Sequence, residues 1–250
     1  MTHLVSLGQG IWLTETALER PAIEVRGAVL VGMRRSAVWD TLCRPADMQP
    51  VIPLVAGHPL AIVYSHSDWD HCWGTAGLPP GDIIAHAAAR GRFAGDTRET
   101  LARMRAENPS TWEGVTLQPP GITFTGMLSL DLGGLTLELH SLPGHTPDSL
   151  VAFIPETGLL LGGDVLEDPF PFLTSPDFLT GWINGLERWA ADPRVKAIAP
   201  AHGRFSDTSL IRLNLAYLRA LERGEDSMPP TADPAYRAVH IENVRIAQRG

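Results

Sequence analysis

At 250 residues, 44% of them hydrophobic, the chain is long enough for one large globular domain, and no linker or low-complexity run divides it. Its formal net charge of -8 argues against nucleic acid as the main partner, because phosphate binding needs clustered Lys and Arg. No apolar run approaches the roughly 18 residues of a membrane span, and no secretory leader is recognisable, so we expect a cytoplasmic protein that does not enter membranes.

Short apolar runs separated by turn residues predict a β-rich first half. A helix is expected at 96–107, with Thr97 as its cap, and at most a short helix in the proline-rich segment 44–58. Three further segments, with Gly133-Gly134 as a turn, are expected to form antiparallel sheet. The predicted strands of this half are 5–16, which turns at the glycines 8 and 10, then 28–33, 36–42, 60–64, 83–86, 122–126, 128–132 and 135–139.

The second half alternates strands with helices. Strands are expected at 150–154, 159–161 and 197–200. A helical stripe of apolar residues occupies 208–223, and weaker helical patterns occur at 185–191 and 235–247.

Four potential metal ligands follow the apolar run 60–64, within the stretch 65–74: His66, Asp68, Asp70 and His71. Alternate residues of a strand face opposite sides, so these four converge only if the backbone turns sharply. Imidazole together with carboxylate suits zinc, non-haem iron or manganese. The alternative is a solvated turn with two incidental histidines. The nearby Cys72 is expected to pack beside the site.

Three later loops each carry one more candidate ligand directly after a predicted strand. They contain His145 in Pro-Gly-His-Thr, Asp164 after two glycines, and His202 in Ala-His-Gly. The glycines let the backbone bend closely around whatever Asp164 faces. Asp40 is expected to cap a loop, and the remaining histidines are expected to be structural or exposed.

The order and context of these loops resemble the metallo-β-lactamase superfamily, whose usual first motif is His-x-His-x-Asp-His. The resemblance implies an α/β fold, an αββα sandwich of two mixed β-sheets flanked by helices. It further implies one domain over 1–250, with a helical tail from about 208, and two divalent metal ions. In the family pattern His66, the residue at 68 and His145 hold one metal, Asp70, His71 and His202 hold the other, and Asp164 bridges them.

Asp68 departs from this pattern, because the usual motif has His at its place. In a rough count, two divalent ions, a bridging hydroxide, Asp70 and Asp164 leave one positive charge, which Asp68 cancels. The added oxygen ligand is expected to favour iron or manganese relative to zinc. The flavodiiron branch, which reduces oxygen or nitric oxide, is similar in having Glu here, but these 250 residues include no flavodoxin-like domain. A third possibility is a single tightly held metal.

The resemblance implies a dinuclear metal-dependent hydrolase in which a metal-bridging hydroxide attacks a small ester, thioester or lactone. Zinc is the first expectation for the two metals, with iron or manganese as alternatives. Asp70 is the expected catalytic residue, orienting or shuttling a proton. The alternatives are a di-iron, oxygen-reactive oxidoreductase related to the flavodiiron branch, and a non-catalytic metal-binding member.

Aromatic residues near the candidate ligands suggest an apolar pocket for a small-molecule substrate. The other reading of those in the loop 168–182 is that they cover the core. The six residues considered are Trp69, Trp73, Phe170, Phe172, Phe178 and Trp182.

Overall fold

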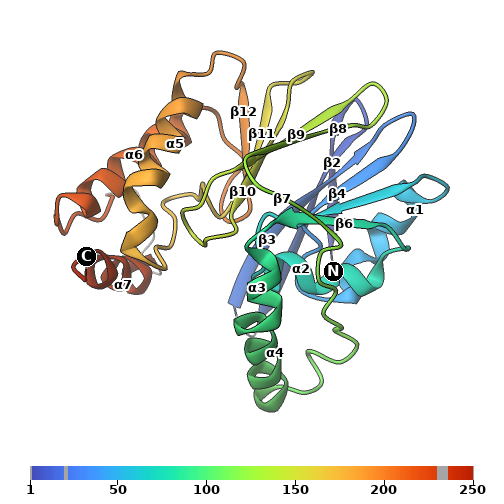
Figure 1. The fold of residues 1–250 in the computed structure, drawn as a ribbon, viewed down its shortest axis with the longest axis horizontal. Coiled ribbons are helices and arrows are strands. Elements are labelled where there is room, and N and C mark those ends of the chain that lie inside the picture. The colour runs from blue at the N-terminus through green and yellow to red at the C-terminus, as the bar shows by residue number, and fades with distance from the viewer. Residues whose placement is uncertain (1, 20–21, 230–235, 250) are drawn as a thin grey trace. The chain divides into compact units, whose positions relative to one another are not determined.

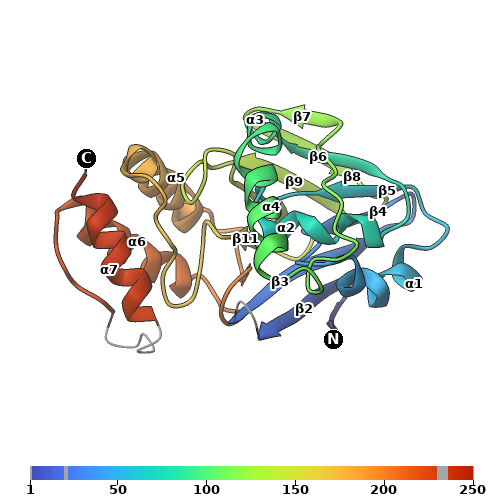
Figure 2. The ribbon, with the colours of Figure 1, turned by 90° about the horizontal axis from the view of Figure 1, so that it is seen from below.

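A computed structural model of the chain describes residues 2–19, 22–229 and 236–249. They form two mixed β-sheets with flanking helices, which confirms the predicted α/β class (Figures 1 and 2). The chain divides into two compact units, residues 1–139 and 140–250. Among the described residues, no helix combines the length and the apolar character needed to cross a membrane.

Seven strands, hydrogen-bonded in chain order, form the sheet of the first unit (Figure 1). Strands β1 to β4 run antiparallel, whereas β4 to β7 pair in parallel. The central strands β4 and β5 are buried along their whole length, as expected for parallel strands covered on both faces. The bounds are β1 His3–Gly8, β2 Ile11–Glu19, β3 Ala22–Val31, β4 Ser36–Trp39, β5 Leu60–Val63, β6 Asp82–His86 and β7 Ile122–Phe124.

Helices follow the parallel strands, and two short ones carry Asp70, His71 and Arg92. After β5 the chain turns into α2 (Trp69–Cys72) and the 3-10 helix η2 (Trp73–Gly77). After β6 come α3 (Ala89–Ala94), which the sequence did not predict, and α4 (Asp96–Glu107), whose bounds agree with the prediction. The segment between β4 and β5 holds only η1 (Pro45–Val51) and α1 (Ile52–Val55), as its prolines require.

Two details of the first unit correct the predictions. Thr97 does not cap α4, because the N-cap residue of this helix is Gly95. The Thr97 hydroxyl instead donates to the carbonyl oxygen of Ser67 at 3.2 Å and so connects α4 to the loop after β5. The segment 122–126 is not antiparallel, because β7 pairs in parallel with β6.

The second sheet has the strand order β12-β11-β10-β9-β8. Its strands are β8 (Met127–Asp131), β9 (Thr136–Ser141), β10 (Leu150–Ile154), β11 (Leu159–Gly163) and β12 (Ala197–Pro200). Strands β10 and β11 are antiparallel, β11 and β12 parallel. The predicted bounds of β10 and β12 are confirmed.

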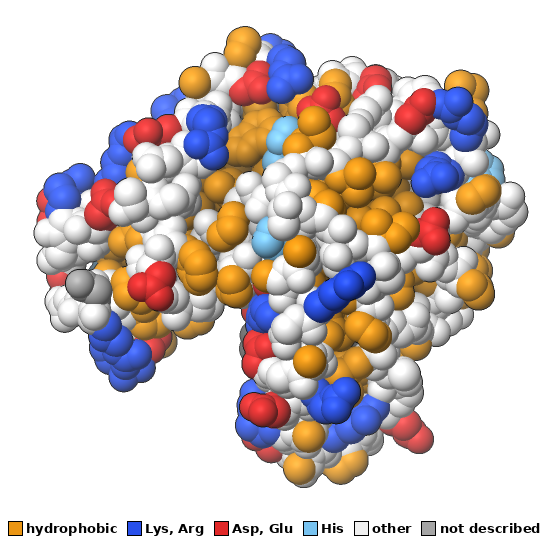
Figure 3. All heavy atoms as spheres, in the orientation of Figure 1, with side chains coloured by type: hydrophobic (Ala, Val, Ile, Leu, Met, Phe, Trp, Pro, Cys, Tyr) orange, Lys and Arg blue, Asp and Glu red, His pale blue; other side chains and the backbone are white. Residues whose placement is uncertain are grey.

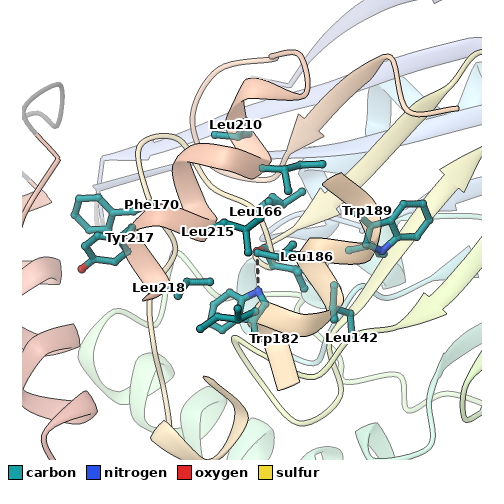
Figure 4. Close-up of a cluster of buried hydrophobic side chains, with 14 of the residues drawn as sticks. Leu142, Leu166, Phe170, Trp182, Leu186, Trp189, Leu210, Leu215, Tyr217 and Leu218 are labelled. Atoms are coloured by element: carbon teal, nitrogen blue, oxygen red, sulfur yellow. Dashed lines mark hydrogen bonds between the residues drawn. The ribbon is translucent and has the colours of Figure 1, made fainter. Parts of the chain in front are cut away.

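Helices with buried aliphatic and aromatic side chains form the core of the second unit. Its helices are η3 (Pro176–Phe178), α5 (Leu179–Ala191), α6 (Ser209–Glu222) and α7 (Arg237–Ala247), and α5 lies beside α6 (Figures 1 and 2). Trp182 is fully buried in this core, where its indole N–H donates to the carbonyl oxygen of Val165 at 3.0 Å (Figure 4). The predicted start of the last helix at 235 lies outside the described residues.

Helix α5 begins six residues before the predicted start of 185. Gly181 and Gly185 lower its intrinsic helix propensity. The apolar residues Leu179, Trp182, Ile183 and Leu186 nevertheless recur at helical spacing and are all buried, so packing overrides propensity here.

Candidate metal centre

The first unit brings its four predicted ligands into two close pairs at the end of β5. Nε2 of His66 lies 3.4 Å from Oδ2 of Asp68, and Nε2 of His71 lies 3.6 Å from Oδ2 of Asp70. The two imidazole rings are neighbours, with their centroids 4.1 Å apart. His66, His71 and Asp70 are buried, so the solvated turn considered from the sequence is not what the chain forms.

Asp40 orients His71 directly and His66 through the hydroxyl of Ser65. Its carboxylate accepts hydrogen bonds from the Ser65 backbone N–H and hydroxyl, both at 2.7 Å, and lies 2.8 Å from Nδ1 of His71. Because the Ser65 hydroxyl donates to Asp40, its oxygen is left to accept from Nδ1 of His66, 3.0 Å away. Both histidines therefore carry their proton on Nδ1, and Nε2 is the atom suited to bind a metal. Asp40 thus does more than cap a loop.

The second unit assembles the remaining three predicted ligands around Asp164, which follows β11. Oδ2 of Asp164 lies 3.6 Å from Nε2 of His145, and Oδ1 lies 3.4 Å from Nε2 of His202. The two oxygens of one carboxylate thus face two different imidazoles. Nδ1 of His145 donates to the carbonyl oxygen of Phe172 at 2.9 Å, which again leaves Nε2 for a metal.

The four nitrogen–oxygen separations fit ligands that share a metal ion. Two ligand atoms each about 2.1 Å from a tetrahedral zinc ion lie about 3.4 Å apart. The separations in the two units are 3.4, 3.6, 3.6 and 3.4 Å, longer than ordinary hydrogen bonds. The donor set of imidazole nitrogen and carboxylate oxygen is also the one that zinc, iron and manganese bind.

Glu167 is a candidate ligand that the sequence analysis missed. Its carboxylate lies within 4.8 Å of ligand atoms of both His145 and Asp164, and it is buried. Burial, and then the negative charge of Asp164, raise the pKa of Glu167 to about 7. Its Oε1 accepts a hydrogen bond from the Phe172 N–H at 3.4 Å. The only signal in the sequence is its position three residues after Asp164, which by itself predicts nothing.

Asp68 has a partner that the sequence also did not reveal. Its Oδ1 accepts a hydrogen bond from Nη2 of Arg92, on α3, at 2.6 Å. Oδ2, the other oxygen, is the one beside Nε2 of His66. Cys72 packs beside the loop as expected, with its thiol 3.2 Å from the carbonyl oxygen of Asp68.

Half of the predicted pocket aromatics are instead core residues. Trp73, Phe170 and Trp182 are fully buried, so they offer no surface to a substrate. Trp73 packs edge-on against Trp112, and Phe170 stacks on Tyr217. For the loop 168–182, the interpretation that its aromatics cover the core is correct for Phe170 and Trp182. The partly buried residues Trp69, Phe172 and Phe178 keep some exposed surface, and their role in a pocket stays a prediction.

A family model described as the metallo-beta-lactamase superfamily matches residues 28–222. The chain belongs to the metallo-β-lactamase superfamily. The match spans both units and includes every ligand predicted from the sequence.

Individual superfamily members are similar over shorter or more divergent stretches. A metallo-beta-lactamase type 2 of Bacteroides fragilis is 31% identical over 101 residues, 38% of this chain and 40% of that protein. A hydroxyacylglutathione hydrolase of Anaeromyxobacter dehalogenans is 27% identical over 131 residues, 50% of this chain and 41% of that protein. The chain thus matches about two fifths of the length of each of these relatives.

Among solved structures, a metallo-beta-lactamase from Pontibacter korlensis superposes with a TM-score of 0.65 at 19% identity. The superposition covers 88% of this chain and 99% of that one. At this identity the likeness concerns the fold, which is the fold that the order of the ligand-bearing loops led us to expect.

Proposed function

We propose that this protein is a dinuclear metal-dependent hydrolase that acts on a small ester, thioester or lactone. The observation that carries the proposal is the position of Asp164, whose two oxygens lie 3.6 and 3.4 Å from Nε2 of His145 and of His202. A carboxylate placed in this way can bridge two metal ions. The His66–Asp68 and His71–Asp70 pairs repeat the same spacing.

The superfamily pattern, applied to these residues, assigns three ligands to each ion. Membership of the superfamily supports this assignment, because its members are mostly metal-dependent hydrolases. His66, Asp68 and His145 would hold one ion, Asp70, His71 and His202 the other, and Asp164 would bridge them.

Two divalent ions, when bound, lower the pKa of water to near neutrality and polarise the oxygen of the group under attack. The role of the protein's own residues is to orient the metal-binding side chains and to hold or move protons. Asp40 and the Phe172 carbonyl fix the Nδ1 protons of His71 and His145. Asp70, buried on α2 beside Nε2 of His71, is the group we propose to orient a proton at its carboxylate oxygen during the reaction.

The substrate class rests on two kinds of support. One relative is named hydroxyacylglutathione hydrolase, which favours a thioester, and the other is named a metallo-beta-lactamase, which makes a β-lactam the natural comparison substrate. Lys and Arg side chains are interspersed with Asp and Glu on the face drawn in Figure 3, which suits a small molecule better than a nucleic acid.

Elemental analysis of protein purified without added metal is the first test, followed by hydrolysis assays on ester, lactone, thioester, β-lactam and phosphodiester substrates. We expect about two ions per chain, zinc first and iron or manganese as alternatives, with activity that chelation removes and metal restores. Bound iron with oxygen consumption would point to the oxygen-reactive alternative. Bound metal without any hydrolysis would point to a non-catalytic member, and a chain that binds no metal would refute the proposal.

A further inference from the structure

Arg92 makes ion pairs with two carboxylates on the first unit. Its Nη2 lies 2.6 Å from Oδ1 of Asp68 and 2.7 Å from Oδ2 of Asp96, and its Nε lies 3.0 Å from the same Asp96 oxygen. The side chains of Arg92 and Asp68 are 16% and 27% exposed, whereas that of Asp96 is 55% exposed. The Arg92–Asp68 pair is therefore the more shielded from water and the less screened by salt.

Asp68 divides its two oxygens between this arginine and the metal-binding histidine. Oδ1 accepts from Arg92, and Oδ2 lies 3.4 Å from Nε2 of His66. An aspartate carboxylate rotates readily about its last side-chain bond. A hydrogen bond that holds one oxygen in place also fixes the direction of the other.

The pair has a further consequence for charge. Asp68 stands where the superfamily motif has a neutral histidine, and alone it would add one negative charge to the centre. The Arg92 guanidinium offsets part of this charge, because it is shared with Asp96, the more exposed of its two carboxylate partners. The expected preference for iron or manganese relative to zinc rests on the added oxygen ligand, and the pairing with Arg92 leaves that expectation in place.

We propose that Arg92 is a positioning residue for Asp68: it aims Oδ2 at the metal and offsets part of the charge of the carboxylate, so that the two residues together replace the histidine of the family motif. This inference rests on the proposed function, because it requires that Asp68 bind a metal. It concerns how the ligand is held and assigns Arg92 no contact with a substrate.

The test is zinc affinity, measured by competition with a chromophoric chelator on the metal-free protein, together with the number of ions bound per chain. Arg92→Gln should weaken binding of one ion about 10- to 100-fold, the usual effect of losing a partner that orients a ligand. Arg92→Lys, which keeps the charge but not the planar fork, should fall between wild type and Arg92→Gln. Arg103→Gln, in the exposed Arg103–Glu107 pair on α4, is the matched control and should bind as wild type does.

The decisive comparison repeats the Arg92→Gln substitution in an Asp68→His background. Histidine needs no arginine partner, so there the substitution should cause no loss of affinity. Equal loss in both backgrounds, no loss in either, or tighter binding by Arg92→Gln would overturn the inference. Circular dichroism of each metal-free variant tests whether it is folded. If Arg92→Gln does not fold, the same comparison is made with Arg92→Lys. A wild-type chain that binds no zinc would refute the proposed function as well, whereas wild-type binding of two ions with an unaffected Arg92→Gln variant would refute only this inference.

Discussion

Replacing Asp40 by Asn should weaken metal binding at His71 without unfolding the protein. Asp40 is fully buried, and its oxygens receive three contacts from donors: the Ser65 N–H and hydroxyl at 2.7 Å and Nδ1 of His71 at 2.8 Å. Asn has almost the same shape, but one of its terminal atoms is a donor. Whichever way the amide points, one buried donor then faces another.

The cost follows from this mismatch. An unmade hydrogen bond of a buried group costs roughly 1–3 kcal/mol. The Ser65 backbone N–H can only donate, so the amide oxygen stays opposite it and the NH₂ faces His71. The ring can then restore a hydrogen bond only by moving its proton from Nδ1 to Nε2, the atom that binds metal. Metal binding must then reverse this change, so the dissociation constant should rise about 5- to 140-fold.

The assay is chelator competition for zinc, with urea denaturation of the metal-free protein beside it. Asp47→Asn is the matched control, because Asp47 is also buried in the first unit but pairs with Arg44 at 2.8 Å. That variant should lose stability and keep its zinc affinity. If Asp40→Asn binds zinc as tightly as wild type does, Asp40 does not set the proton position on His71, and the reasoning fails.

Three further substitutions test the second unit. Asp164→Ala should leave fewer than two tightly bound ions per chain by elemental analysis, because the carboxylate that faces two histidines is gone. Gly144→Ala should lower the free energy of unfolding in urea by roughly 1–3 kcal/mol, because the new Cβ would lie 2.4 Å from Cδ2 of the buried Trp182. Asn243→Ala should lower it by roughly 1–3 kcal/mol, because hydrogen bonds at 2.8 and 2.9 Å to the backbone of 171–173 are lost.

Each of these has a control or a contrary outcome. Two tightly held ions in Asp164→Ala would contradict its bridging role. Gly181→Ala, where a Cβ meets nothing within 4 Å, should be neutral or stabilising by up to about 1 kcal/mol; an equal loss at both glycines would contradict the clash with Trp182. Ile241→Ala, at a position 61% exposed on α7, should change stability by less than about 0.5 kcal/mol, and a similar loss there would mean that Asn243 has no special role.

The predicted ligands could be found from the sequence because each follows a strand within a short local pattern. The short apolar runs 60–64 and 197–200, each followed by turn residues, predict strands from their own residues, so the ligand-bearing loop after each is placed correctly. The four side chains from His66 to His71 need only the turn at the end of β5 to form their two close pairs.

The partners of these ligands could not be predicted in the same way. Arg92 and Glu167 take their importance from what lies next to them in space: Arg92 reaches Asp68 only because α3 follows the neighbouring strand. Burial of Phe170 and Trp182 is likewise decided by the packing of α5 and α6, since an aromatic residue suits a pocket wall and a core equally well.

The hydrogen bonds of Asn243 affect where the C-terminus of an expressed fragment of this protein should be placed. The Phe172 carbonyl oxygen accepts a hydrogen bond from His145. Asn243 of α7 forms hydrogen bonds with the backbone of the residues before and after Phe172, Pro171 and Leu173. The family match ends at residue 222, before that helix begins. A fragment trimmed to the match would keep all seven predicted ligands yet omit the helix that steadies one of them. Such a fragment could be mistaken for an intrinsically weak metal binder, when the weakness would have been introduced by the choice of its last residue.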